Sequence, residues 1–269
     1  MMSTSWTVID KRLATVEADV RGRLAPPPSA STAAELAETL GLQLDPWQLD
    51  VLAGDWPRAL LNCSRQSGKS TVTALLAAAE VTQVPGAMVL IVAPSDRQSA
   101  LLFRTAARFY RDLGGTIPAN VDTRRSLELT NGSQLHALPG REATVRGYAG
   151  VDLLLIDEAS RVPDELYQAT RPMLATSGGR VVGLSTPAGR RGWWYEAWVD
   201  AAQDWRRVAV PATSCPRIPA AFLAEERREL PARVYEAEYE CMFHDADDAY
   251  FATDLIDAAF AADVEPWDL

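Results

Sequence analysis

The chain has 269 residues, of which 48% are hydrophobic and 23% are charged, and its formal net charge at pH 7 is −10. This composition is ordinary for a globular protein with a large core, and the length suits one α/β unit with extensions. The acidic balance argues against a general nucleic-acid coat, because phosphate binding normally shows as a basic surface. No apolar run approaches the roughly 20 residues of a membrane span, so we expect no membrane partner.

The termini and cysteines give an expectation about the compartment. Residues 1–10 lack the basic segment and apolar stretch of a signal peptide. Three cysteines, a small and odd number, are typical of free thiols in a reducing environment. We therefore expect an intracellular protein. Its basic residues are almost all arginines, so local arginine patches remain possible.

The first 43 residues are predicted to form a helical arm and linker. Apolar residues recur at helical spacing over residues 5–23, and the three prolines of residues 26–28 interrupt that pattern. Ser31 or Thr32 can cap a second helix over residues 33–40. This front end is interpreted as an accessory arm.

Residues 58–72 predict a phosphate-binding loop. A short apolar run indicates a buried strand, a turn follows, and Gly68, Lys69 and Ser70 open an apolar helix. Unpaired N–H groups at such a helix start can cradle phosphate oxygens, while the lysine reaches the β- and γ-phosphates and the serine hydroxyl holds Mg²⁺. The usual pattern has glycine where this chain has Cys63, and a chance Gly-Lys-Ser at a helix start is the alternative.

Just upstream, Trp47 and Gln48 begin another predicted helix. A glutamine amide can pair with the adenine edge, and a tryptophan can pack on a base. The alternative is a helix start in which Trp47 belongs to the core.

An acidic pair follows the apolar run of residues 153–156. Ligands of parallel sheets bind beyond the carboxyl ends of the strands, where Asp157 and Glu158 would project. Asp157 can hold Mg²⁺, and Glu158 can orient and deprotonate the attacking water. The pair could instead cap the next helix, but its combination with an upstream phosphate loop is more specific than either motif alone.

Two further segments fit the same site. Ser185 and Thr186 end a predicted strand that starts at residue 180, and their hydroxyls could sense the γ-phosphate or simply form a turn before Pro187. Arg146, next to Gly147, could be presented to a neighbouring subunit's γ-phosphate or be a plain surface arginine.

The other predicted elements complete an α/β pattern. A buried strand covers residues 87–93, and a helix capped by Ser95 or Asp96 runs to Gly114. Alternating residues around Asn131-Gly132 predict a hairpin. A strand over 205–210 and helices over 221–229, 231–239 and 252–262 follow. The tryptophan-rich segment from residue 193 is interpreted as core, and the cysteine and histidine at 241–244 are not taken as a metal site.

Taken in order, these motifs resemble the ATPase domain of the large terminase subunit of tailed phages. The resemblance covers about residues 44–250. Residues 45–48 resemble that family's adenine motif, residues 63–70 its divergent Walker A, residues 153–158 its Walker B with the catalytic glutamate, and residues 183–189 its coupling motif. Residues 235–243 are similar to the stretch that closes the domain.

The resemblance implies a three-layer α/β P-loop NTPase of the ASCE, RecA-like type, with a mostly parallel central sheet and an N-terminal helical arm. The expected domains are the arm over 1–43, the ATPase over 44–245, and a tail or linker over 246–269. The implied cofactors are ATP and Mg²⁺. By position, the catalytic residues are Glu158, Arg65, Arg146 and Lys69; the cofactor contacts are Trp47, Gln48, Ser64, Arg65, Gln66, Ser67, Gly68, Lys69, Ser70, Thr71, Ser185 and Thr186; and the metal ligands are Ser70 and Asp157.

The implied activity is ATP hydrolysis coupled to translocation of double-stranded DNA by a homo-oligomeric ring on the portal, with a small terminase subunit as partner, in the cytoplasm of the bacterial host. Arg65 is the candidate arginine acting within a subunit and Arg146 the one acting on a neighbour. Nuclease activity is not expected, because too few residues follow Tyr250 for the family's RNase H-like domain. A nucleotide-binding assembly module that depends on a nuclease or portal partner is one alternative, and a helicase-like ATPase is another.

Overall fold

The computed structural model describes residues 32–54, 56–114, 117–138, 140, 145, 147–245, 255 and 258–260. The predicted helix over residues 5–23, the proline linker and Arg146 lie outside the described residues, as does most of the predicted final helix. Within the described part, no helix is long and apolar enough to cross a membrane.

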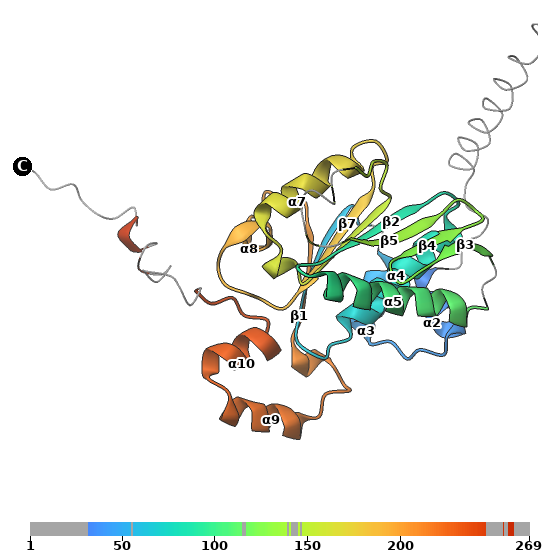
Figure 1. The fold of residues 1–269 in the computed structure, drawn as a ribbon. Helices are drawn as coiled ribbons and strands as arrows, with labels where there is room; N and C mark the ends of the chain where they lie inside the picture. The colour runs from blue at the N-terminus through green and yellow to red at the C-terminus, as the bar shows by residue number, and fades with distance from the viewer. Residues whose placement is uncertain are drawn as a thin grey trace, which may run out of the picture.

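A mostly parallel eight-stranded sheet forms the centre of the protein, in the order β3-β4-β5-β2-β6-β7-β1-β8 (Figure 1). The two pairings at one edge, β3 with β4 and β4 with β5, are antiparallel, and the others are parallel. The strands are β1 Arg58–Cys63, β2 Met88–Val92, β3 Ala119–Asp122, β4 Ser126–Leu129, β5 Gln134–Leu138, β6 Leu153–Asp157, β7 Arg180–Ser185 and β8 Arg206–Val210.

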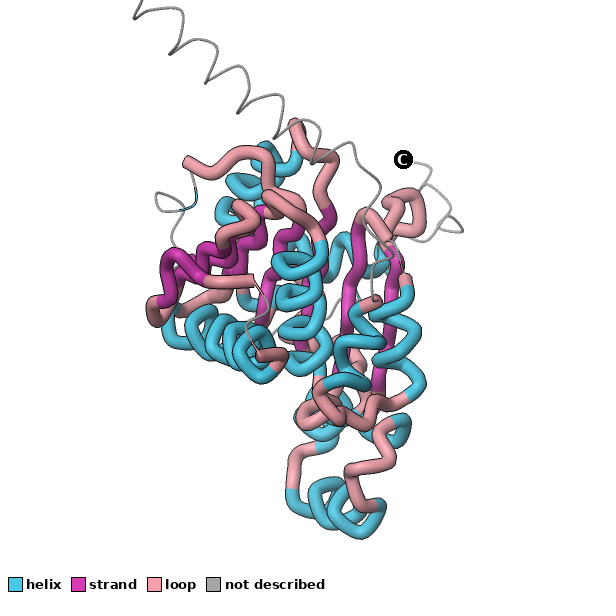
Figure 2. The backbone as a smooth tube through the Cα atoms, turned by 90° about the vertical axis from the view of Figure 1, so that its right-hand side faces the viewer, coloured by secondary structure: helices cyan, strands magenta, loops and turns pink. Residues whose placement is uncertain are grey.

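Helices cover both faces of this sheet, which gives the three layers predicted from the sequence (Figure 2). One hydrophobic core lies under α2, α3, α4 and α5, and a second lies under α7 and α8. The helices are α2 Ala33–Thr39, α3 Pro46–Ala53, α4 Lys69–Gln83, α5 Asp96–Asp112, α7 Asp164–Thr170, α8 Gly192–Val199, α9 Ala220–Glu229 and α10 Ala232–Tyr239, with 3₁₀ turns η1 Ala159–Arg161, η2 Arg171–Leu174 and η3 Ala212–Ser214.

The central strands are continuous apolar runs because both of their faces are covered. Every residue of β6 is buried, as are all residues of β1 after Arg58. Close packing extends to Gly183 of β7, where an added Cβ would lie 2.8 Å from the Trp194 ring of α8. The tryptophan-rich segment of α8 is therefore core, as the sequence analysis interpreted it.

Helices α9 and α10 form a small separate unit beside the end of the sheet (Figure 1). Their contact centres on Leu223, Tyr235 and Tyr239.

The three cysteines, Cys63, Cys215 and Cys241, are free and buried, and Cys241 donates its thiol to the Val210 carbonyl at 3.2 Å. Burial raises the pKa of each thiol, that of Cys241 to about 12.

Three helices and strands were not predicted: β3, α7 and α8, the last of which was interpreted only as a core segment. Strand β3 pairs only with β4 at the sheet edge, has four residues and is mostly exposed, so its short alternation of apolar and polar residues is too weak a signal to predict a strand. Helix α7 is a short helix with only Leu166 and Thr170 buried, which is too few for a periodic pattern. The hairpin around Asn131-Gly132 is confirmed as β4 and β5.

Candidate nucleotide site

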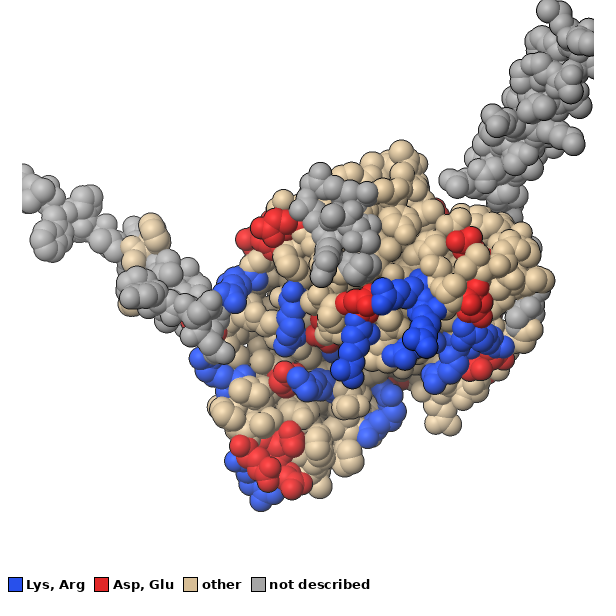
Figure 3. All heavy atoms as spheres, viewed as in Figure 1, with Lys and Arg blue, Asp and Glu red and all other residues tan. Residues whose placement is uncertain are grey.

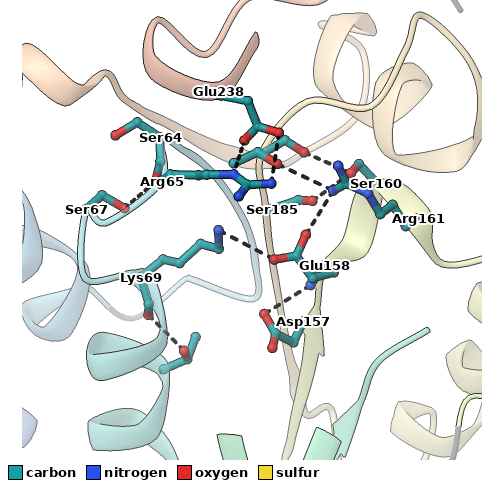
Figure 4. Close-up of polar contacts among 12 residues, drawn as sticks. Ser64, Arg65, Ser67, Lys69, Asp157, Glu158, Ser160, Arg161, Ser185 and Glu238 are labelled. Atoms are coloured by element: carbon teal, nitrogen blue, oxygen red, sulfur yellow. Dashed lines mark hydrogen bonds and ion pairs between the residues drawn. The ribbon is translucent and has the colours of Figure 1, made fainter. Parts of the chain in front are cut away.

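The phosphate loop and the acidic pair meet at one edge of the sheet. Strands β6, β7 and β1 are neighbours and parallel, so their carboxyl ends lie together. Lys69 Nζ, at the start of α4, lies 3.6 Å from Glu158 Oε1, at the end of β6 (Figure 4). The cavity between them measures about 380 Å³ and is lined by Arg65, Gln66, Lys69, Gln98, Glu158, Arg161 and Thr186.

The loop between β1 and α4 has the backbone of an anion-binding turn. Gly68 has φ +90° and caps α4, and Gln66 has φ +60°. The buried Ser67 hydroxyl donates to the Ser64 carbonyl at 2.8 Å, which closes the loop on itself. These left-handed residues turn the chain sharply, so the loop wraps around the N-terminus of α4, whose unpaired N–H groups attract phosphate.

Asp157 and Glu158 occupy different environments although they are adjacent. Asp157 is buried, and its Oδ1 accepts a bond from the Glu158 N–H at 3.0 Å. Burial, with a smaller contribution from the neighbouring Glu158 charge, raises the pKa of Asp157 to about 6. Glu158 itself has φ +49°, a left-handed conformation that costs energy in a residue with a side chain and is typical of functional sites.

An arginine that the sequence analysis missed holds Glu158. Arg161 Nη1 donates to Glu158 Oε2 at 2.9 Å and reaches Thr186 Oγ1 at 3.4 Å. The hydroxyl of the intervening Ser160 lies 2.6 Å from the Ser185 hydroxyl and donates to the Thr186 carbonyl at 2.8 Å. The turn after β6 is thus tied to the end of β7, and the two predicted hydroxyl residues lie beside the acidic pair.

Arg65 points toward α10. Its guanidinium donates to both carboxylate oxygens of Glu238, at 2.7 and 3.2 Å (Figure 4). The backbone N–H of Arg65 also donates to the backbone carbonyl of Glu238, at 2.9 Å. The hydrogen bond and the charge of Glu238 raise the pKa of Arg65. The arginine of the phosphate loop therefore links the nucleotide site to the α9–α10 unit.

Gln48 braces the phosphate loop from the other side. It is buried, its Oε1 accepts the Asp45 N–H at 2.8 Å, and its Nε2 donates to the Gly68 carbonyl at 3.5 Å. Arg217, which the sequence analysis also missed, donates to Asp45 Oδ2 at 2.7 Å and to the Ser67 carbonyl at 2.8 Å. These bonds fix the loop, and the adenine contact of Gln48 stays a prediction.

The remaining predicted contacts lie around this centre. Trp47 packs at the edge of the core, and its buried indole N–H has no partner among the described residues. Ser70 and Thr71 are in the first turn of α4, where the Ser70 side chain is exposed. A hydroxyl and a carboxylate are the oxygen donors that Mg²⁺ prefers, so Ser70 and Asp157 fit that ion chemically.

A central sheet between two layers of helices, with a phosphate loop, a lysine at a helix start and an acidic pair at the end of a nearby strand, defines a P-loop nucleotide-binding fold. The chain belongs to a particular family with this fold. Residues 60–258 match the family model for the terminase large subunit, T4likevirus-type, N-terminal. The recognition made from the motifs is therefore confirmed.

Known relatives agree with this assignment. The large terminase subunit of Thermus virus P23-45 is 28% identical over 179 residues, which cover 59% of this chain and 36% of that protein. The chain therefore spans about a third of the length of this curated relative.

Two solved structures show the same fold. The large terminase ATPase domain of Thermus phage P74-26 has a TM-score of 0.69 and 22% identity, covering 81% of this chain and all of that one. The large terminase of a thermophilic bacteriophage, solved in complex with ADP, has a TM-score of 0.65 and 11% identity, covering 75% of this chain and 54% of that one.

Proposed function

We propose that this chain is the ATP-hydrolysing motor domain of a phage DNA-packaging terminase and that it couples hydrolysis to translocation of double-stranded DNA into the procapsid. The observation that carries the proposal is the 3.6 Å approach of Lys69 to Glu158, beside the buried Asp157. A phosphate-binding lysine and a carboxylate base within one cavity meet the main requirements of phosphoryl transfer to water.

Each residue has a proposed task. The N–H groups at the start of α4 and the Lys69 ammonium bind the β- and γ-phosphates. Ser70 and Asp157 would hold Mg²⁺, which would supply positive charge to offset the charge on the phosphate oxygens. Glu158 orients the attacking water and accepts its proton, and Thr186, beside Arg161, links the state of the site to the end of β7.

The arginines and partners extend this proposal. Arg65 acts on the γ-phosphate within the subunit, and Arg146 acts on that of a neighbour, as in other P-loop enzymes that use an arginine finger. The proposed assembly is a homo-oligomeric ring on the portal, with the small terminase subunit and double-stranded DNA as further partners, in the host cytoplasm.

A second candidate is a nucleotide-binding assembly module that turns over little ATP without a partner. The observation favouring it is that Glu238 holds Arg65 while Arg161 holds Glu158. A portal or nuclease partner would then have to release these groups before hydrolysis.

Phosphate release from ATP and Mg²⁺, measured over a range of protein concentrations with and without duplex DNA, tests the proposal. A motor site completed by a neighbour predicts activity per molecule that rises with concentration, and the Arg146→Ala variant abolishes that rise. Binding of ATP without hydrolysis at any concentration or with DNA would favour the assembly module instead.

A further inference from the structure

One face of α5 carries a line of exposed arginines. Arg97, Arg104 and Arg108, hereafter the arginine stripe, lie seven and four residues apart with exposed Leu101 between the first two. These separations keep them on one side of the helix. The opposite side packs into the core through the buried residues Leu102, Phe103, Ala106, Ala107, Phe109 and Tyr110.

The stripe lies between Asp96 and Asp112, the first and last residues of α5, and Asp96 is engaged by Arg125. None of its three arginines forms an ion pair within the part of the chain that the structure describes, whereas the nearby Arg111 pairs with Asp122 at 2.6 Å. Figure 3 shows basic side chains gathered on the face over α5. A concentrated positive surface on a protein with a net charge of −10 favours one particular polyanionic partner over general coating of nucleic acid.

The stripe begins beside the nucleotide site. Helix α5 starts where β2 ends, and Gln98, in its first turn, lines the nucleotide cavity. At 1.5 Å per residue, the stripe from Arg97 to Arg108 is about 16 Å long. This length corresponds to about five phosphates of one strand, at 3.4 Å each along a duplex axis.

We propose that the arginine stripe contacts the phosphate backbone of double-stranded DNA. Guanidinium groups suit phosphate oxygens, and a line of them suits a repeating backbone better than a compact anion. Single strands are usually held by exposed aromatic side chains on which bases stack. All three aromatic residues of α5 are buried, so its exposed face offers no such platform. The choice of duplex DNA rests on the proposed packaging function.

This location gives the contact a mechanical consequence. The exposed face of α5 would contact DNA, and its first turn lines the nucleotide cavity. A rigid-body shift of the helix would therefore move both contacts together. The stripe therefore places the DNA contact on the same helix that lines the site of hydrolysis.

Fluorescence anisotropy of a labelled 30-base-pair duplex, titrated with the whole chain at several salt concentrations, tests the stripe. The Arg104→Ala/Arg108→Ala variant removes two phosphate contacts without touching a residue of the nucleotide cavity. It should weaken binding and reduce the slope of log K against log salt by about 2, since each phosphate contact contributes about 0.9. The Arg171→Ala/Arg228→Ala variant removes the same charge from exposed positions outside α5 and should keep the wild-type slope.

The proposal is overturned if the α5 variant and its control bind duplex with the same slope, or if wild type does not bind duplex. It is also overturned if the α5 variant loses affinity for a single strand but not for duplex. Phosphate release measured on the same samples separates the two proposals. Duplex binding that depends on the stripe in a protein that never hydrolyses ATP supports the stripe and refutes the motor.

Discussion

The contact between Arg65 and Glu238 makes a quantitative prediction about ATP binding. If Arg65 serves the γ-phosphate, Glu238 competes with the nucleotide for the same guanidinium, so Glu238→Gln should tighten ATP binding. The Arg65 side chain is 63% exposed and that of Glu238 18%. Exposed ion pairs contribute up to about 1 kcal/mol, and this bidentate pair belongs to the upper half of that range. If the Arg65–Glu238 pair contributes about 0.5–1 kcal/mol, removing it should lower the dissociation constant of ATP about 2- to 5-fold.

The assay is equilibrium titration with a fluorescent, slowly hydrolysed ATP analogue. Glu240→Gln is the matched control, because Glu240 caps the C-terminal end of α10, two residues after Glu238, and pairs with an exposed arginine of α9, Arg227. Its affinity should equal that of wild type. An unchanged or weaker affinity in Glu238→Gln would refute the competition and leave Glu238 as a purely structural partner of the loop.

Three other outcomes are expected. Arg161→Ala should lower kcat about tenfold with little change in KM, because it removes a charge-assisted bond of about 1.5–3 kcal/mol, partly screened by solvent, that orients Glu158. Arg161→Lys should restore part of the rate, and equal loss in both variants, or a change in KM alone, would contradict this role of Arg161. Gly183→Ala should lower stability by about 1–3 kcal/mol in thermal unfolding, because the added methyl group meets Trp194, whereas Gly147→Ala, with open space around it, should not. The three buried cysteines should resist alkylation at pH 8 in the native protein and react fully in denaturant, since burial raises their pKa values and blocks access of the reagent. Rapid labelling of the native protein would contradict the burial of these thiols.

The centre of the site could be predicted because its residues are specified locally. Gly68 is required where the chain adopts φ +90° before α4, and a buried strand ending in Asp157 and Glu158 places both carboxylates at the sheet edge. The parallel sheet followed from the apolar runs of residues 59–61, 87–93 and 153–156. Such signals depend on a few consecutive residues, so a single sequence carries them.

The supporting contacts could not be predicted, because they join distant segments. Arg217 reaches the phosphate loop from 150 residues away, and Glu238 reaches Arg65 from 173 residues away. Arg217 lies in no motif, and the resemblance of residues 235–243 gives Glu238 no role of its own, so only the folded chain reveals these two contacts.

Two supporting contacts, in contrast, join residues that are three apart in the sequence. Asp45 and Gln48 have the spacing of a capping box, and the structure contains the bond from the Asp45 N–H to Gln48 Oε1. Arg161 follows Glu158 by three residues, the separation at which opposite charges meet on a helical turn.

Steady-state phosphate release by wild type and Glu158→Gln, with nucleotide affinity measured on the same samples, tests the central claim most directly. Loss of the general base should reduce hydrolysis by a factor of about 10² or more while ATP binding stays within a few-fold of wild type. Glu165→Gln, a matched change on exposed α7 in the same chain, should leave both quantities unchanged. Equal hydrolysis by Glu158→Gln and wild type would show that the carboxylate beside Lys69 is not the base and would contradict the site described above.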